Sequence, residues 1–374
     1  MRILYGVVGE GMGHAMRSRV VLDDLVERHD VQVVVSGRAY DYLNKRASEH
    51  LAVKKIWGLT IVAEDNEVRN FRTLLQNAKG AVQGFPQNVR AYFDIAEKFR
   101  PDVVVSDFES WSYLFARNLG LPVISVDNMQ VINRCRHAPA LLAGHEAEFQ
   151  LAKGIIKAKL PGAYHYLITS FFQPPIRKRR TSLHPPILRP EILAAKPAEG
   201  DHLLVYQTYT SNTRLPEILM SSGRECRIYG VRRELAEEQV EGNLRYRPFS
   251  EQGFIEDLRT ARGVVASGGF TLMGEAVYLH RPMLSVPVAG QFEQVLNARY
   301  LEELGYGLYA DELTAEKLGE FLDKLPRFAE RLARQTQDGN RQLLGRLEEI
   351  LQRARSGEPP EQGTVPGEDR SDQG

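Results

Sequence analysis

The chain has 374 residues, of which 43% are hydrophobic and 26% charged, a globular balance with enough apolar material for two cores. Lysine plus arginine and aspartate plus glutamate each number 48, so the net charge gives no reason to expect a nucleic-acid-binding protein. No run approaches the ~18 apolar residues that span a bilayer.

The first half of the chain predicts a doubly wound α/β domain. An apolar run over residues 2–8 precedes a glycine loop, a helical pattern over 15–27 and a second strand over 31–35. This order of strand, loop, helix and strand opens such a domain. Further strands are expected at 53–56, 103–105, 123–126 and 164–169, with helices over 70–80, 86–99 and 110–119.

The glycine loop, which holds Gly9, Gly11 and Gly13, also admits a dinucleotide site. Its spacing is GxGxG rather than GxGxxG, and the second strand ends in Ser36-Gly37-Arg38, with no acid for a ribose 2′-hydroxyl. Because Arg38 suits a 2′-phosphate, NADP stays open as an alternative ligand.

Polar side chains follow two strands of the predicted sheet, with Asp107 and Glu109 in one loop and Asn128 in the next. The carboxyl ends of strands are where open α/β sheets place ligands, so we expect these loops to face the same crevice as His14. The alternative for either acid is to cap the helix that begins near Ser110.

Between residues 171 and 200, prolines and the basic run 177–180 interrupt all periodicity. We interpret 173–200 as a linker that includes the first short strand of the second half. Strands are then expected at 203–206, 225–229, 244–247, 263–266 and 283–288. The prediction is two Rossmann-like, doubly wound parallel-sheet domains, 1–172 and 201–325, that face a cleft.

The end of the chain divides into two parts. Residues 326–355 have a charged helical pattern, which predicts a C-terminal helix. Residues 356–374 are acidic, contain prolines and have almost no apolar side chain, which predicts a disordered tail.

Gly268 and Gly269 fall at a predicted turn from strand to helix, where small residues let backbone N–H groups approach an anion, most simply a phosphate. Glu275 lies one helical turn after Thr271, on the same face, and its carboxylate can accept two hydrogen bonds from a ribose diol.

A second group follows the strand over 283–288. Glu293 and Gln294 open another predicted helix with acceptors and an amide, which suits vicinal hydroxyls. In chain order, the two groups could bind a phosphate, a ribose and a sugar, the three parts of a nucleotide sugar that need binding positions.

The stretch from 267 to 298 resembles the donor-binding signature of GT-B glycosyltransferases, which include the plant UDP-dependent enzymes and the N-acetylglucosaminyltransferase of peptidoglycan assembly. The matching residues are Gly268, Gly269, Thr271, Glu275, Glu293, Gln294, Asn297 and Ala298. Ser267 stands where the plant signature has a histidine, which leaves the diphosphate to the hydroxyls of Ser267 and Thr271 and to the backbone.

The resemblance implies a nucleotide sugar, UDP-linked, in the second domain and a hydroxyl-bearing acceptor, a glycan, lipid or small molecule, in the first. Thr208 and Ser211 are candidate donors to the diphosphate, or else a plain polar turn, and fold analogy puts Phe249 beside the base. The resemblance makes His14 the general base, because an imidazole with a pKa near ~6.5 removes a proton at neutral pH. Asp107 is expected to orient it. The position of His14 alone fits a capping or packing histidine instead.

The acceptor side of the predicted site consists of Gly11, Gly13, Arg17, Glu109 and Asn128. No Asp-x-Asp motif is present, which argues against a metal-held diphosphate, and no cofactor beyond the co-substrate is expected. In the resembling fold a C-terminal helix packs back on the first domain, and inversion at the anomeric carbon is also implied by the resemblance.

Two other functions stay open: a non-hydrolysing nucleotide-sugar 2-epimerase, and an inactive nucleotide-sugar-binding protein. The start of the chain reads as a strand rather than a signal peptide, and Cys135 and Cys226 show no metal spacing, so a cytoplasmic protein is expected. The basic amphipathic pattern over 146–160 fits either peripheral contact with an anionic membrane or an ordinary surface helix.

Overall fold

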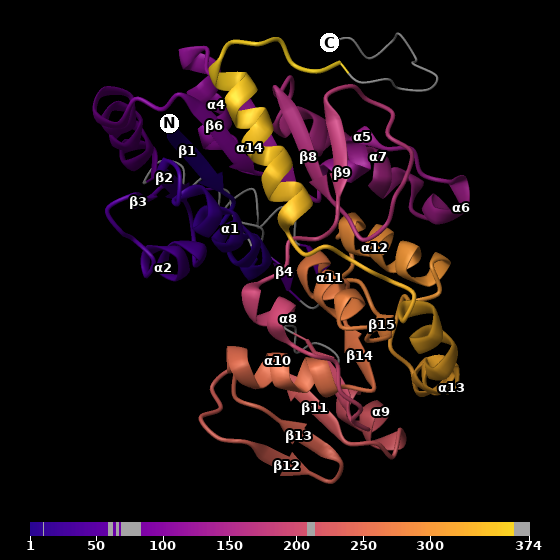
Figure 1. The fold of residues 1–374 in the computed structure, drawn as a ribbon. Helices are drawn as coiled ribbons and strands as arrows, with labels where there is room; N and C mark the ends of the chain where they lie inside the picture. The colour runs from indigo at the N-terminus through magenta and orange to yellow at the C-terminus, as the bar shows by residue number, and fades with distance from the viewer. Residues whose placement is uncertain (10, 59–62, 65–66, 69–83, 208–213, 363–374) are drawn as a thin grey trace. The chain divides into compact units, whose positions relative to one another are not determined.

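The computed structural model describes residues 1–362 except 10, 59–62, 65–66, 69–83 and 208–213 (Figure 1). The chain forms two compact units. The first contains Met1–Val62, Arg69–Ile187 and Asp338–Gly374, and the second contains Ala63–Val68 and Leu188–Gln337.

The first unit is built on a seven-stranded sheet in the order β3-β2-β1-β6-β7-β8-β9, with every neighbouring pair parallel. Its strands are β1 (Arg2–Val7), β2 (Asp30–Val35), β3 (Leu51–Lys55), β6 (Val103–Asp107), β7 (Val123–Asp127), β8 (His165–Thr169) and β9 (Thr181–His184). The central strands are valine-rich and buried, as in sheets covered on both faces. The winding direction reverses between β1 and β6, so the topological switch point lies there.

Helices pack around this sheet. They are α1 (Met12–Leu25), α2 (Ala39–Asn44), a helix over 84–94 that ends in a π turn η1 (Ile95–Phe99), α4 (Ser110–Leu119), α5 (Gln130–Arg134), α6 (Pro139–Leu142), α7 (Glu146–Lys159) and α14 (Arg341–Arg355). Although α14 comes last in the chain, its apolar face enters the core of this unit with Leu347 and Leu351, and its Glu348 accepts a hydrogen bond from His29 at 2.8 Å.

The second unit repeats the plan with the order β12-β13-β11-β10-β14-β15-β16. Its strands are β10 (Leu203–Tyr206), β11 (Cys226–Tyr229), β12 (Gln239–Glu241), β13 (Leu244–Tyr246), β14 (Gly263–Ala266), β15 (Met283–Ser285) and β16 (Gly307–Tyr309). Among the described strands of this sheet, only the edge strand β12 is antiparallel to its neighbour. The switch point lies between β10 and β14.

The helices of this unit are α8 (Pro190–Ala194), α9 (Leu215–Ser221), α10 (Glu251–Thr260), α11 (Phe270–Tyr278), α12 (Phe292–Glu303) and α13 (Ala315–Leu332). A short antiparallel pair, β4 (Ala63–Glu64) and β5 (Glu67–Val68), also belongs to it.

The predicted fold class, two doubly wound parallel-sheet domains, is confirmed. The prediction that the short strand of the linker belongs to the second half was wrong. The strand found there, β9, pairs in parallel with β8 and extends the first sheet. The prediction of a single helix over 326–355 was also wrong, because two helices, α13 and α14, share this stretch. Pro326 lies inside α13, and the chain then turns through Gly339, whose φ is +77°, before α14 begins. The helix expected over 70–80 lies entirely outside the described residues.

The predicted tail lies outside the described residues from 363 onward. In its described part, Glu361 forms ion pairs with Arg346 and Arg353 of α14.

Candidate active site

His14 and Asp107 lie at the switch point of the first unit. Val7 at the end of β1 is paired in register with Asp107 at the end of β6, and His14 stands in the first turn of α1, which follows β1. The topology therefore brings two side chains 93 residues apart in sequence into contact, with Nδ1 of His14 2.8 Å from Oδ1 of Asp107.

The carboxylate of Asp107 is fully buried and is held by three side chains. Besides His14, Nε of Arg17 donates to Oδ2 at 2.9 Å, and the Ser18 hydroxyl donates to Oδ2 at 2.9 Å. Burial favours the protonated acid, but the positive charge of Arg17 and the hydrogen bonds from Arg17 and His14 outweigh it and hold the pKa of Asp107 well below its usual range. Asp107 is therefore a buried anion at neutral pH.

His14 is arranged as a neutral imidazole. Burial lowers its pKa, the positive charge of Arg17 lowers it further, and Asp107 opposes both effects. Nδ1 also lies 2.6 Å from Nη2 of Arg17, so this nitrogen either donates to Asp107 or accepts from Arg17, according to the tautomer. Nε2 has no hydrogen-bond partner among the described residues, and 18% of the side chain is exposed.

The other predicted acceptor-side residues have structural contacts. Glu109 caps α4, since its carboxylate accepts from the N–H groups of Trp111 at 2.8 Å and Ser112 at 2.6 Å. Arg17 is buried and also donates to the amide oxygen of Asn128. Arg17 is therefore a buried member of the cluster around Asp107.

The two glycines of the first loop differ in their surroundings. Gly11 is the N-cap of α1 with φ +77°, a value that favours glycine, and an added Cβ would meet nothing within 4 Å. Gly13 lies in the first turn of α1 and is partly exposed. Among the described residues, nothing fills the space beside Gly11, which suits a ligand.

Two residues missed in the sequence adjoin this cluster. Lys159, at the end of α7, has its Nζ 3.8 Å from the ring centre of Phe108, which stands between Asp107 and Glu109 with a left-handed φ of +55°. Nothing in the local sequence around Lys159 places it near His14, because only the packing of α7 does so.

In the second unit, Gly268 and Gly269 occupy the switch point between β10 and β14. Gly268 has φ +93°, and an added Cβ would lie 2.8 Å from Oγ of Ser285 and 3.1 Å from the backbone oxygen of Gln294. Gly269 is the N-cap of α11 with an ordinary φ of −62°, and an added Cβ would meet nothing within 4 Å. Packing and backbone conformation thus explain the first glycine but not the second.

The N-terminus of α11 lies directly after the glycine turn. Its cap makes no side-chain hydrogen bond, and its first turn contains no acidic residue. Ser267 and Thr271 flank it, both partly exposed, and neither hydroxyl has a hydrogen-bond partner among the described residues. An uncapped helix N-terminus with two hydroxyls is suited to an anion.

Glu275 has a buried partner that the sequence did not indicate. Nε of Arg189 donates to Oε1 at 2.7 Å and Nη2 donates to Oε2 at 2.8 Å, and the Glu275 and Arg189 side chains are only 3% and 4% exposed. Arg189 also contacts Glu251 at 2.7 Å. Burial opposes the charge of Arg189, but the two carboxylates raise the pKa of its guanidinium. The contact of Glu275 with a ribose stays a prediction.

The predicted sugar-binding pair also supports the glycine turn. Asn297 donates through Nδ2 to the backbone oxygen of Gly268 at 3.3 Å and to Oε1 of Glu293 at 3.2 Å. Oε1 of Gln294 accepts from the backbone N–H of Val288 at 3.0 Å. α12 is thereby tied to the loops that follow β14 and β15, and Glu293 keeps a partly exposed side chain.

Phe249 follows β13 and is 63% exposed immediately before the N-cap of α10. An exposed aromatic ring at this edge of the sheet is suited to stacking on a base. Thr208 and Ser211 lie outside the described residues, so their predicted diphosphate contacts have no structural description.

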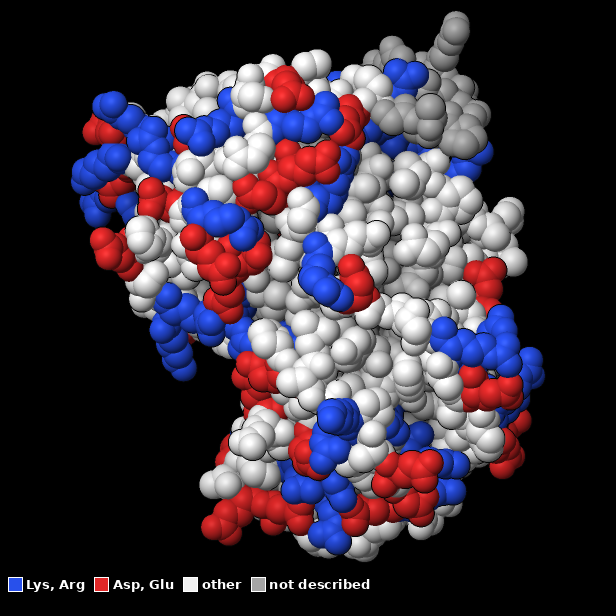
Figure 2. Space-filling model, in the orientation of Figure 1, with Lys and Arg blue, Asp and Glu red and all other residues white. Residues whose placement is uncertain are grey.

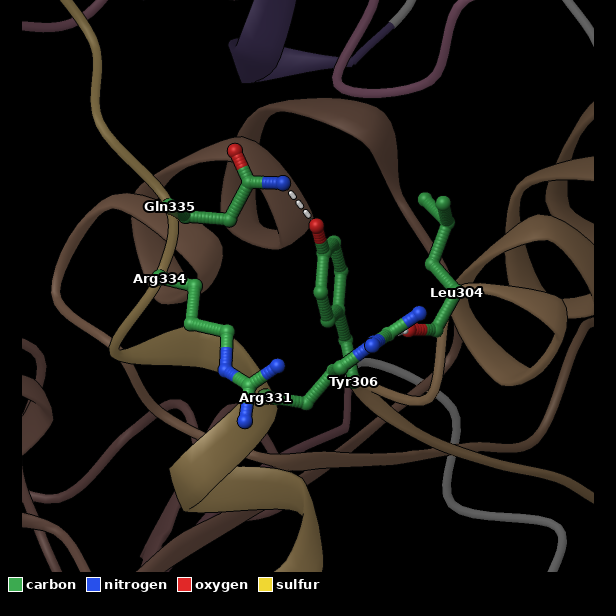
Figure 3. A pocket seen from close by; sticks show the side chains of 5 residues that line it. All are labelled: Leu304, Tyr306, Arg331, Arg334 and Gln335. Carbon is green, nitrogen blue, oxygen red and sulfur yellow. Dashed lines mark hydrogen bonds between the residues drawn. The ribbon is translucent and has the colours of Figure 1, made fainter.

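A cavity of about 250 Å³ elsewhere in the second unit is lined by Leu304, Tyr306, Arg331, Arg334 and Gln335 (Figure 3). Gln335 donates a hydrogen bond to the hydroxyl of Tyr306, which immediately precedes β16. The cavity therefore lies at the amino end of a strand, whereas ligands of open α/β sheets bind at the carboxyl ends.

Positive and negative side chains are interspersed on the face drawn in Figure 2. Within the described parts of the chain, no three histidine, cysteine or acidic side chains group as metal ligands, so metal independence stays a prediction.

None of the described helices combines the length and hydropathy needed to cross a bilayer.

Two doubly wound domains, each with a polar cluster at its switch point, place the chain among the two-domain α/β proteins that bind ligands at the carboxyl ends of their strands. The chain belongs to glycosyl transferase family 1, whose family model matches residues 1–326.

Two relatives, uncharacterized glycosyltransferases of Methanosarcina mazei and Methanosarcina acetivorans, are 25% and 24% identical over 344 residues, 82% of this chain and 85% of theirs.

Solved glycosyltransferases have the same fold. A glycosyltransferase of Arabidopsis thaliana in complex with UDP-L-rhamnose superposes with a TM-score of 0.63 at 16% identity, covering 93% of this chain and 98% of that one. A UDP-glucosyltransferase of Polygonum tinctorium gives a TM-score of 0.65 at 14% identity, covering 94% and 98%. The GT-B resemblance is confirmed.

Proposed function

We propose that this glycosyltransferase is a cytoplasmic enzyme that moves a hexose from a UDP-linked donor to a hydroxyl acceptor, with inversion and without a metal ion. The observation that carries the proposal is the His14–Asp107 pair at the first switch point, 2.8 Å between Nδ1 and Oδ1. A neutral imidazole held by a buried carboxylate is the arrangement of a general base.

The first unit supplies the base. When Nδ1 of His14 carries its proton and donates to Asp107, Nε2 is unprotonated and available to the acceptor. The acceptor oxygen forms a bond to the anomeric carbon as its proton passes to Nε2. The bond from that carbon to the diphosphate breaks, and UDP leaves with the electron pair. One displacement with one base inverts the anomeric configuration.

The second unit stabilises the leaving group. The N–H groups at the start of α11, with the hydroxyls of Ser267 and Thr271, offer donors to the departing diphosphate, whose negative charge grows as the bond breaks. Glu275 is proposed to hold the ribose through lone pairs that Arg189 leaves unused, Glu293 and Gln294 to hold the sugar, and Phe249 to stack on the base.

A panel of nucleotide sugars tests the proposal. We expect one UDP-sugar to raise the unfolding temperature, since a ligand at about 100 times its dissociation constant adds about 2.7 kcal/mol to stability. The same UDP-sugar should release UDP when a hydroxyl acceptor is present. If no nucleotide sugar stabilises the protein, the donor assignment is wrong, whereas binding without any UDP release in a broad acceptor panel would make the protein a binding module.

We also propose that α7 brings the enzyme to an anionic membrane surface. Leu151 and Ile155 lie one turn apart and are 63% and 56% exposed, with Lys153 and Lys157 on the same helix. Exposed apolar side chains among lysines suit an anionic interface. Co-sedimentation with phosphatidylglycerol vesicles should weaken in L151S/I155S, and equal co-sedimentation of parent and variant would contradict this role.

A further inference from the structure

A cavity of about 390 Å³ lies at the edge of the first sheet, between the end of β3 and the helix over 84–94. Its volume is in the range of small-molecule sites. Its lining comprises Lys54, Lys55, Pro86, Gln87, Arg90, Ala91 and Asp94.

Specific contacts fix the walls of this cavity. Nε2 of Gln87 donates to the backbone oxygen of Lys55 at 2.7 Å. Asn88 accepts from the backbone N–H of Trp57 at 2.8 Å and donates to its carbonyl oxygen at 3.0 Å. A Cβ at Gly84 would lie 2.1 Å from Cγ of Trp57, so the described part of the helix is in close contact with the segment after β3.

The charge balance of the cavity is positive. The only acidic residue in its described lining, Asp94, is occupied on both oxygens, by Lys54 at 2.7 Å and by Lys98 at 3.1 Å. Nζ of Lys55 lies 5.3 Å from the ring centre of Tyr40. Neither Lys55 nor Arg90 forms an ion pair with another residue in the described part of the chain. Two cations therefore stand in the cavity without a neutralising acid among the residues that the structure describes.

Strand register relates this cavity to the proposed base. Asp107 is paired with Val7, Val7 with Val35, and Val35 with Lys55. These four residues form a row across the carboxyl edge of the sheet. At about 4.8 Å per strand, the three steps separate the backbones of Asp107 and Lys55 by ~14 Å. The cavity and His14 thus share the edge where ligands bind.

We propose that Lys55 and Arg90 bind a phosphate or pyrophosphate group of the acceptor while the acceptor hydroxyl lies at His14. This inference rests on the proposed function in taking the first unit as the acceptor side. An arginine guanidinium, with its paired N–H donors, and a nearby lysine ammonium together suit the recognition of phosphate oxygens. The acceptor is then a phosphorylated hydroxyl compound, either soluble or a lipid whose headgroup carries the phosphate.

Chemical modification of Lys55 in the full chain tests this site in the absence of any nucleotide sugar. An amine-reactive acetylating reagent is applied with and without inorganic pyrophosphate, and in a second arm with phosphatidylglycerol vesicles. Mass spectrometry follows Lys55, with exposed Lys45 as the reference in the same sample. We expect protection of Lys55 but not of Lys45.

Variants of Arg90 connect the protection to the site. Arg90→Ala should raise the half-protecting concentration about tenfold, the usual result of losing a charge-assisted hydrogen bond. Arg90→Lys should restore part of it, and Arg117→Ala, which removes an exposed charge from α4, should match the parent.

Protection by pyrophosphate supports the site with a soluble phosphate, and protection by vesicles alone supports it with a lipid headgroup. The proposal is overturned if neither agent protects Lys55, or if Arg90→Ala behaves as the parent does. Because no nucleotide is present, the outcome is independent of the donor assignment. A chain that binds no nucleotide sugar but shows Arg90-dependent protection would refute the proposed function and leave this site standing.

Discussion

Arg189 holds Glu275 through two parallel hydrogen bonds, of 2.7 and 2.8 Å, inside the second unit. The pair joins the start of α8 to the middle of α11, the helix that carries the glycine turn. A carboxylate expected to meet a ribose is therefore already fixed by the protein, which makes Arg189 a candidate positioning residue for the donor.

Replacement of the pair separates its structural role from its ligand role. Glu275→Ala should lower the free energy of unfolding by about 3–5 kcal/mol, because it leaves the buried Arg189 charge without its main partner. The double variant R189L/E275L should recover most of that loss, since an apolar pair of similar volume often replaces a buried ion pair at little cost.

Donor binding should not recover in the double variant. If Glu275 contacts the ribose, R189L/E275L unfolds like the parent in urea and yet shows no thermal stabilisation by the UDP-sugar that the parent binds. Parent-like stabilisation would show that the pair is purely structural.

The two glycines at the start of α11 offer a matched comparison. Gly268→Ala should destabilise the fold by about 1 kcal/mol or more, because φ is +93° and the new Cβ would approach Ser285 closely. Gly269→Ala meets open space at an ordinary φ, so stability should change little.

UDP affinity should change in Gly269→Ala, where the methyl group takes the place of the diphosphate. Calorimetric titration of UDP into the parent and Gly269→Ala measures this. An unchanged dissociation constant in Gly269→Ala would place the diphosphate elsewhere.

Much of the fold was predictable because buried parallel strands have continuous apolar sequences. The helix over 110–119 and the strand over 263–266 were predicted with their observed ends. The short strand expected in 173–200 was assigned to the wrong half, because Thr181–His184 lies among basic residues and prolines, and only its pairing with β8 places it in the first sheet.

The candidate site was predictable in part. Loop positions after strands brought His14 and Asp107 together correctly, because parallel strands end at one edge. Arg189 was beyond prediction, since it lies 86 residues from Glu275 in a proline-rich segment without periodicity. Glu109 shows the reverse case, where the capping alternative describes its contacts in the structure.

His14→Ala should abolish most transfer while it preserves donor binding. Loss of a general base lowers the rate by about 10²–10⁴. The donor contacts proposed here all lie in the second unit, so thermal stabilisation by the UDP-sugar should match that of the parent. Equal rates of UDP release in the variant and the parent would remove His14 from the mechanism.

The pH profile should report the charge of Arg17. Burial and Arg17 lower the pKa of His14, so the base stays unprotonated, and transfer persists, below the ordinary histidine pKa of about 6.5. Arg17→Gln removes one lowering influence, and the acid limb of kcat/KM should move to higher pH. A limb that stays in place or moves lower would mean that another group controls it.

Two histidines of the first unit should make the fold sensitive to acid. Nε2 of His165 lies 3.0 Å from the hydroxyl of Ser182, and Nε2 of His184 lies 2.9 Å from it. Burial and the nearby Arg346 lower the pKa of each imidazole to about 4. Between about pH 6.5 and 4 the unfolded chain therefore binds protons that the folded chain does not.

Stability should then fall as the pH falls through that window, by about 1.4 kcal/mol per pH unit for each histidine. Urea unfolding at pH 7 and pH 5, followed with a probe in the first unit, measures the slope. His184→Gln should reduce it by the share of one histidine, about 1.4 kcal/mol per pH unit. His50→Gln should not reduce it, because Asp30 raises the pKa of that exposed imidazole and gives the opposite sign. Equal unfolding midpoints of the parent at both pH values would show that both imidazoles are hydrated in solution.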